Sequence, residues 1–155
     1  MSAKKLGALF AIVLMLSAAV GGLVVKKSLA ASATANATQT VIAAIAITKV
    51  TDLDFGSAPQ GDPQKTVAPA AGASFSITGA PNTAYTITVP SDGTVTMANG
   101  GNTIAVDSFT SSPSATGTLD GAGAQTLRVG ATRAALAGNQ AVGSYTGTFT
   151  VTVVY

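Results

Sequence analysis

Aspartate is the only residue type in this sequence that recurs at a spacing suited to catalysis or metal binding. The 155-residue chain has no histidine and no cysteine, and all six of its acidic residues are aspartates. This composition excludes Ser-His-Asp and Cys-His nucleophilic systems and the usual zinc sites. Asp52 and Asp54 would share one face of a strand, where a paired-carboxylate hydrolase or a Ca²⁺ site is conceivable. Two solvated acids at the end of a strand are the better interpretation.

The remaining candidate groups also have structural explanations. Asp62, Asp92 and Asp120 each lie beside glycine or proline, where aspartate commonly stabilises turns. Three tyrosines could stack on a glycan, although their strand positions favour packing in the core or at a sheet edge: Tyr85, Tyr145 and Tyr155. We therefore predict no enzymatic activity, no cofactor and no metal site.

The N-terminus has the pattern of a secretory signal. Lys4 and Lys5 precede an apolar stretch over residues 6–25, and small residues follow it. We predict a signal peptide over residues 1–30, cleaved between Ala30 and Ala31, with cleavage after Ala33 as second choice. A retained membrane anchor is the alternative, because the apolar stretch is about 20 residues long and is followed by two lysines. In both cases the rest of the chain is expected in the periplasm, at the cell surface or outside the cell.

The exported part has a different charge balance from the whole chain. Residues 31–155 hold four basic and six acidic residues, a net charge of −2, whereas the whole chain carries +2. No basic cluster remains, so we expect no nucleic-acid binding, and membrane contact only through the signal segment. About 125 residues suit a single domain with its own core, which we assign to residues 31–155.

Short alternating segments separated by turn residues dominate this domain. Side chains alternate with a period of two in a strand, and no segment has the period of an amphipathic helix. The expected strands cover residues 38–50, 73–78, 85–89, 94–97, 104–109, 116–119, 127–131 and 144–155. This pattern predicts an all-β fold, an antiparallel immunoglobulin-like (pilin-like) β-sandwich.

The first of these segments is unusually long. Alternation begins at Ala31 and runs for about 18 residues, or on the order of 60 Å, whereas ordinary strands have about 5 or 6 residues. One interpretation is a donor strand that completes the sheet of another subunit. Its candidate anchors are Val41, Ala43, Ile45 and Ile47. The alternative is a first strand within its own domain, preceded by an Ala/Thr-rich leader.

The last segment alternates most regularly. Residues 144–155 read SYTGTFTVTVVY, with threonines on one face and large apolar side chains on the other. The apolar face suits either a core or an assembly contact. Its candidate assembly residues are Gly143, Tyr145, Phe149, Val151, Val153 and Tyr155.

Three stretches carry a resemblance to a known family. They read AITKVTDLDFGSAPQG at residues 46–61, FSITGAPNTAYTITVP at 75–90, and FTSSPSATGTLDGAGAQTLRVGATRAALAGNQAVGSYTGTFTVTVVY at 109–155. In these stretches the chain resembles exported bacterial proteins that carry domain of unknown function 4402. The resemblance implies a small secreted β domain and no known activity.

A weaker likeness is to subunits of chaperone–usher pili. Their last strand alternates, with a glycine upstream and a tyrosine near the end, parts that Gly143 and Tyr155 would take. The pilin tyrosine is usually penultimate, whereas Tyr155 is terminal. This likeness implies a periplasmic chaperone strand beside the terminal strand, later replaced by the N-terminal arm of another subunit.

We expect an exported structural subunit of a bacterial surface fibre or matrix that assembles with copies of itself by β-strand addition. The alternative is a monomeric cell-surface or periplasmic binding module, with glycans as the candidate ligand. A hydrolase is a distant third interpretation.

Overall fold

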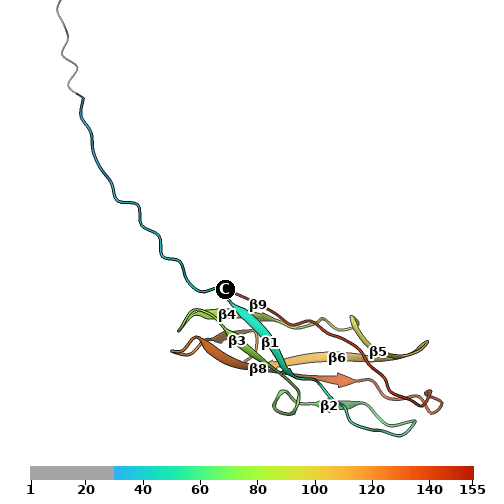
Figure 1. Cartoon of the computed structure of the whole chain (residues 1–155). Helices are drawn as coiled ribbons and strands as arrows, with labels where there is room; N and C mark the ends of the chain where they lie inside the picture. Colours follow the sequence, from blue (N-terminus) through green and yellow to red (C-terminus); the bar gives the residue numbers. More distant parts are fainter. Residues whose placement is uncertain (1–29) are drawn as a thin grey trace, which may run out of the picture. The chain divides into compact units, whose positions relative to one another are not determined.

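The computed structural model describes residues 30–155, so the predicted signal peptide lies outside the described residues except for Ala30 (Figure 1). Residues 30–45 have no regular secondary structure, and the first strand begins at Ala46. Within the described range no helix is long and apolar enough to cross a membrane.

The strands form two antiparallel sheets. The large sheet has the order β1 (Ala46–Thr51), β3 (Ala73–Thr78), β8 (Ala124–Arg133), β6 (Asn102–Ser112) and β5 (Val95–Asn99), with β2 (Lys65–Val67) also paired to β8. The small sheet has the order β7 (Thr116–Thr118), β4 (Ala84–Thr88) and β9 (Thr152–Val154). A 3₁₀ turn at Pro69–Ala71 connects β2 to β3. This confirms the predicted all-β antiparallel sandwich.

The core lies where the inward faces of the strands meet. Ile77 of β3 and Leu127 and Val129 of β8 are fully buried, at 0% exposure. The small sheet contributes Tyr85 and Ile87 to the same cluster. Alternate side chains of a strand point to opposite faces, so these inward positions alternate with exposed threonines such as Thr86 and Thr88.

The C-terminal segment connects the two sheets. Thr146 forms an isolated bridge to Ala98 of β5, with N···O distances of 2.8 and 3.1 Å, and β9 then pairs with β4. Between these points Phe149 packs on Phe75 and Phe109, with ring centroids 6.3 and 5.2 Å away. The segment, red in Figure 1, therefore holds the large sheet to the small one.

Two predicted strands are too long. The strand predicted over residues 38–50 begins only at Ala46, because Ala46 pairs with Thr78, the last residue of β3 before the chain turns at Gly79. The strand predicted over residues 144–155 is a regular ladder only at Thr152–Val154, because the segment leaves one sheet for the other. A further strand, β2, lies between the predicted strands 38–50 and 73–78, where no strand was predicted.

Gly147 permits this crossing. A Cβ atom at Gly147 would lie 2.3 Å from the backbone oxygen of Thr96 and 3.1 Å from the Cα atom of Met97. Backbone atoms cannot move aside as a flexible side chain can, so the terminal segment approaches β5 this closely only without a side chain.

We therefore expect Gly147→Ala to destabilise the fold by about 1–3 kcal/mol, the usual cost of overpacking. Urea unfolding followed by circular dichroism measures the loss. Gly121→Ala is the matched control, because a Cβ atom there meets nothing within 4 Å. The control should be neutral or slightly stabilising, since alanine restricts the unfolded chain. Equal stability of the two variants would contradict the assigned crossing.

Candidate functional site

The two aspartates predicted to share a strand face lie after β1 and contact separate partners. Asp52 forms an ion pair with Lys49 at 2.7 Å, with both side chains exposed. The Oδ1 atom of Asp54 accepts a hydrogen bond from the backbone N–H of Gly56 at 2.7 Å. Within residues 30–155 no cluster of three acidic, histidine or cysteine side chains is placed to hold a metal ion. These contacts are those of a strand end and a tight turn.

One of the other aspartates, Asp120, stabilises a turn as predicted, whereas Asp92 lies in a turn but bonds to a neighbouring strand. The Oδ1 atom of Asp92 accepts a hydrogen bond from the N–H of Ser108, at the bulge in β6, at 2.6 Å. The Oδ1 atom of Asp120 accepts bonds from the N–H groups of Ala122 and Ala124, both at 2.9 Å. Asp62 has a different role, which the sequence analysis missed.

Asp62 neutralises a buried arginine. Arg133, at the end of β8, is 3% exposed and forms an ion pair with Asp62. Its Nη1 atom also donates to the backbone oxygens of Pro63 and Ala134, at 3.1 and 2.9 Å. A buried charge requires such partners, and here they tie the loop before β2 to the last residues of β8.

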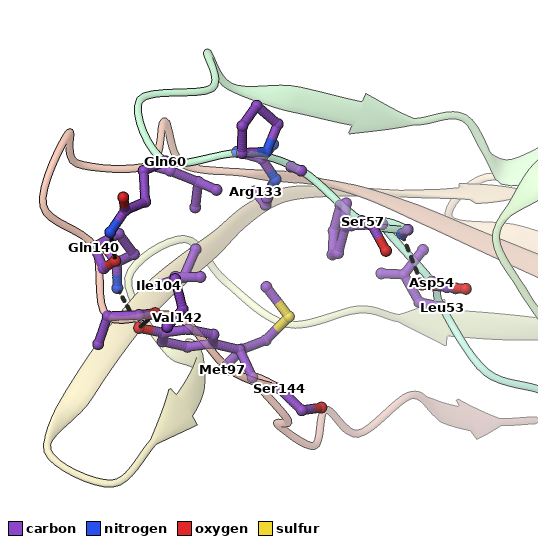
Figure 2. Close-up of a pocket in the computed structure, with 18 residues that line it drawn as sticks. Leu53, Asp54, Ser57, Gln60, Met97, Ile104, Arg133, Gln140, Val142 and Ser144 are labelled. Carbon is purple, nitrogen blue, oxygen red and sulfur yellow. Dashed lines mark hydrogen bonds between the residues drawn. The ribbon is translucent and has the colours of Figure 1, made fainter.

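A groove lies next to this ion pair. It has a volume of about 750 Å³ and separates the loop Leu53–Gln60 from the segment Gln140–Tyr145. Figure 2 shows Gln60, Ser57 and Leu53 on the loop, Gln140, Val142 and Ser144 on the opposite segment, and Met97 and Ile104 between them. A volume of this size is within the usual range for small-molecule sites.

Neutral polar side chains organise the groove. The Nε2 atom of Gln60 donates to the backbone oxygen of Gln140 at 2.5 Å. The Nε2 atom of Gln140 donates to the hydroxyl of Tyr145 at 2.7 Å, and that hydroxyl donates to the backbone oxygen of Ala141 at 2.9 Å. Because Asp62 neutralises Arg133, the charge left in the lining is the carboxylate of Asp54, and the groove otherwise offers amides, hydroxyls and the rings of Phe55 and Tyr145.

A smaller cavity continues along the same side of the sandwich. Its volume is about 370 Å³, and it lies between Leu53 and Phe55 on one side and Tyr145, Gly147 and Phe149 on the other. Leu53 and Phe149 are only partly buried against the core. Asp52 and Thr146 also line it, and the other lining residues are mainly apolar. This cavity is therefore a mainly apolar opening into the sandwich between two chain segments that lie far apart in the sequence.

The candidate assembly face of the terminal segment lies mainly in the protein's own core. Val151 and Val153 are each 8% exposed, and Phe149 is half-buried. Tyr145 is half-buried and lines both cavities. Gly143 is exposed at φ +141°, where a Cβ atom would lie 2.3 Å from the Nδ2 atom of Asn99.

Tyr155 closes one end of the sandwich. Its hydroxyl donates to the backbone oxygen of Ala43 at 3.2 Å and accepts from the N–H of Ala80 at 2.5 Å. A Cβ atom at Gly79 would lie 2.1 Å from that hydroxyl, so Gly79 leaves the room it occupies. Among the other tyrosines, Tyr85 is a core residue whose hydroxyl donates to Gln125 at 2.6 Å, and burial raises the pKa of its phenol.

The four candidate donor anchors divide into two pairs. Ile45 and Ile47 are half-buried and pack against the core of their own domain. Val41 and Ala43 are exposed, Val41 at 84%. Only the part of the arm before Ile45 therefore presents side chains that its own domain leaves uncovered.

We expect Arg133→Met to lower the free energy of unfolding by about 2–3 kcal/mol, because hydrogen bonds to a buried charged group are each worth about 1.5–3 kcal/mol. Lys49→Met is the matched control, since it removes an exposed ion pair worth at most about 1 kcal/mol. Urea denaturation of both variants makes the comparison. Similar losses in the two would contradict a structural role for the Arg133 pair.

Comparison with protein families matches residues 57–155 to one described as a domain of unknown function (DUF4402). Comparison with curated proteins and with solved structures found no match. The matched range includes the C-terminal segment that lines both cavities. It excludes β1 and the residues that precede β1. Since the match covers well over half of the sequence, the chain belongs to the DUF4402 family.

Proposed function

We propose that this chain is an exported structural subunit of a bacterial surface fibre or matrix, and that copies of it assemble by β-strand addition. The observation that carries the proposal is the arm, which we define as residues 31–45. It has no regular secondary structure, and Val41 and Ile42 are 84% and 55% exposed. An extended segment with uncovered apolar side chains, joined directly to an edge strand, suits pairing with a second sheet.

The composition of the arm favours insertion into another protein. Residues 31–45 contain no charged side chain, so their burial removes no charge from water. They also contain no proline or glycine, so every residue can donate a backbone hydrogen bond and none weakens an extended strand. The arm therefore meets the backbone requirements of an added strand.

The energy of such an assembly comes mainly from the backbone. Burying Val41 contributes about 1.5–3 kcal/mol, and the alanines of the arm contribute less. Each added hydrogen bond contributes about 0.5–1.5 kcal/mol net, so a ladder along the arm exceeds the contribution of any one side chain. Because Ile45 and Ile47 pack in their own domain, they supply the fixed base of the arm rather than its anchors.

An aspartate at Val41 tests this function. We expect residues 31–155 carrying Val41→Asp to remain monomeric in light scattering, because insertion would bury an unpaired carboxylate. The unsubstituted protein should form larger species. Thr40→Asp is the matched control: the alternation places it on the opposite, solvent-facing side of the strand, so assembly should persist. A monomeric, cooperatively unfolding unsubstituted protein would overturn the proposal.

The groove supports a second candidate function, a surface-binding module for neutral oligosaccharides. The amides of Gln60 and Gln140 and the ring of Tyr145 are the groups with which a protein holds an uncharged sugar. No residue of the arm lines this groove.

Titration of maltohexaose and chitohexaose, followed by nuclear magnetic resonance, tests the second function. We expect Tyr145→Leu to weaken binding about tenfold or more, a loss of about 1.4 kcal/mol. Tyr155→Leu lies outside the groove and should leave the affinity unchanged. Absence of binding to the unsubstituted protein, or equal effects of the two substitutions, would remove this candidate.

A further inference from the structure

We propose that the arm of one copy docks in a specific opening of a second copy, between β1 and the C-terminal segment, with the side chain of Val41 in the cavity beside Leu53 and Phe149. This inference rests on the proposed structural function and identifies the receiving site. We call the opening the seam. It is bounded by residues 43–55 on one side and residues 144–155 on the other.

Each boundary of the seam includes an edge strand without a partner on the seam side. β1 pairs with β3 alone, and β9 pairs with β4 alone. Within residues 30–155 no backbone hydrogen bond joins residues 43–55 to residues 144–155. An unpaired edge presents free N–H and C=O groups that another strand can complete, and here two such edges flank one opening.

The two edges run antiparallel, as contacts at both ends indicate. At one end the Tyr155 hydroxyl contacts the backbone oxygen of Ala43. At the other end Leu53 and Gly147 line the same cavity of about 370 Å³. As the residue number rises along one edge, it falls along the other, so a strand placed between them is parallel to one edge and antiparallel to the other.

Among the described residues, no backbone pairing closes the seam. β1 and β9 lie in different sheets and do not pair with each other. At the Ala43 end the Tyr155 hydroxyl, a side-chain group, makes the contact between the two boundaries. An inserted strand would supply backbone partners to both boundaries.

The seam is apolar and already partly filled. Ile45, Ile47 and Leu53 from one edge and Phe149 from the other pack against the core without being fully buried. A cavity of about 370 Å³ lies at the Leu53 end. An apolar side chain suits this cavity, and the odd-numbered residues of the arm are four alanines, Gln39 and then Val41.

The lengths match in one orientation. Ala31 and Val41 are ten positions apart in the sequence, and so are Ala43 and Leu53, a span of about 33 Å in each case. With Val41 at the cavity, the arm runs parallel to β1 and antiparallel to the terminal segment. The body of the donor copy then begins just beyond the cavity, because only four residues separate Val41 from its own β1.

The arm is unsuited to filling the seam of its own domain. To lie beside its own β1, the arm would have to reverse direction between Ala43 and Ala46, where the sequence is Ala-Ala-Ile-Ala. Tight reversals between strands favour Asn-Gly, Asp-Gly or Gly-Gly pairs, and none is present there. The occupant we infer is therefore the arm of a second copy.

Cysteine crosslinking tests the docking in a chain that has no cysteine of its own. Residues 31–155 are prepared with Val41→Cys and, separately, with Leu53→Cys, then mixed and oxidised. Crosslinked peptides are identified by mass spectrometry. A disulfide needs Cα atoms within about 7 Å, so only a docked arm brings these positions of two copies together. Tyr145→Cys, at a half-buried position that lines the same cavity, is a second acceptor in case Leu53→Cys perturbs folding.

Ile42→Cys is the matched donor control, because alternation places residue 42 on the face opposite Val41. We expect at least tenfold more mixed disulfide from Val41→Cys than from Ile42→Cys with either acceptor. Larger species in light scattering without this preference would overturn the seam as the receiving site and leave the assembly function standing. Monomers without crosslinks would overturn both the seam as the receiving site and the assembly function.

Discussion

Two sheets held together at one side by a single C-terminal segment define this molecule. The segment bridges to β5 at Thr146, places Phe149 between Phe75 and Phe109, and ends as β9 beside β4. The chain has no disulfide, so packing and backbone pairing must supply the connection. The segment crosses from one sheet to the other. Because of this crossing, some of its backbone N–H and C=O groups pair with neither sheet. The same constraint that closes the core therefore leaves the seam open.

The seam is the site at which we propose that the arm of a second copy docks. A sheet edge that solvent alone covers is exposed to unintended pairing, and proteins commonly protect such edges with charges, prolines or bulges. The edge of β1 carries the exposed Lys49–Asp52 pair near one end, yet most of the seam is apolar. The arm is uncharged and small-sided over its first ten residues. In the proposed assembly an uncharged strand enters a mainly apolar opening, so its docking buries no unpaired charge.

The period-two alternation predicted most of the fold, since the strands around Phe75, Tyr85 and Leu127 lie where their apolar residues place them. Strand ends depended on partners that the sequence does not reveal: β1 starts at Ala46 only because β3 ends at Thr78. The alternation over residues 144–155 correctly predicted that Val151 and Val153 are buried. It did not predict that the segment crosses between the sheets, for which Gly147 was the one indication. The groove and the Asp62–Arg133 pair join residues 70 or more positions apart, which local patterns do not encode.

Family membership and assembly concern different parts of the chain. The match to DUF4402 starts at residue 57 and includes every strand except β1. The terminal segment and the acceptor wall of the seam near Phe149 lie inside it, whereas the arm and the opposite wall at Leu53 lie outside. The proposed donor and one wall of the proposed receiving site thus belong to one continuous N-terminal stretch, residues 31–55. That stretch also supplies the edge strand β1 and the core residue Phe55, so the proposed assembly contact is built on the sandwich itself and not on a separate appendage.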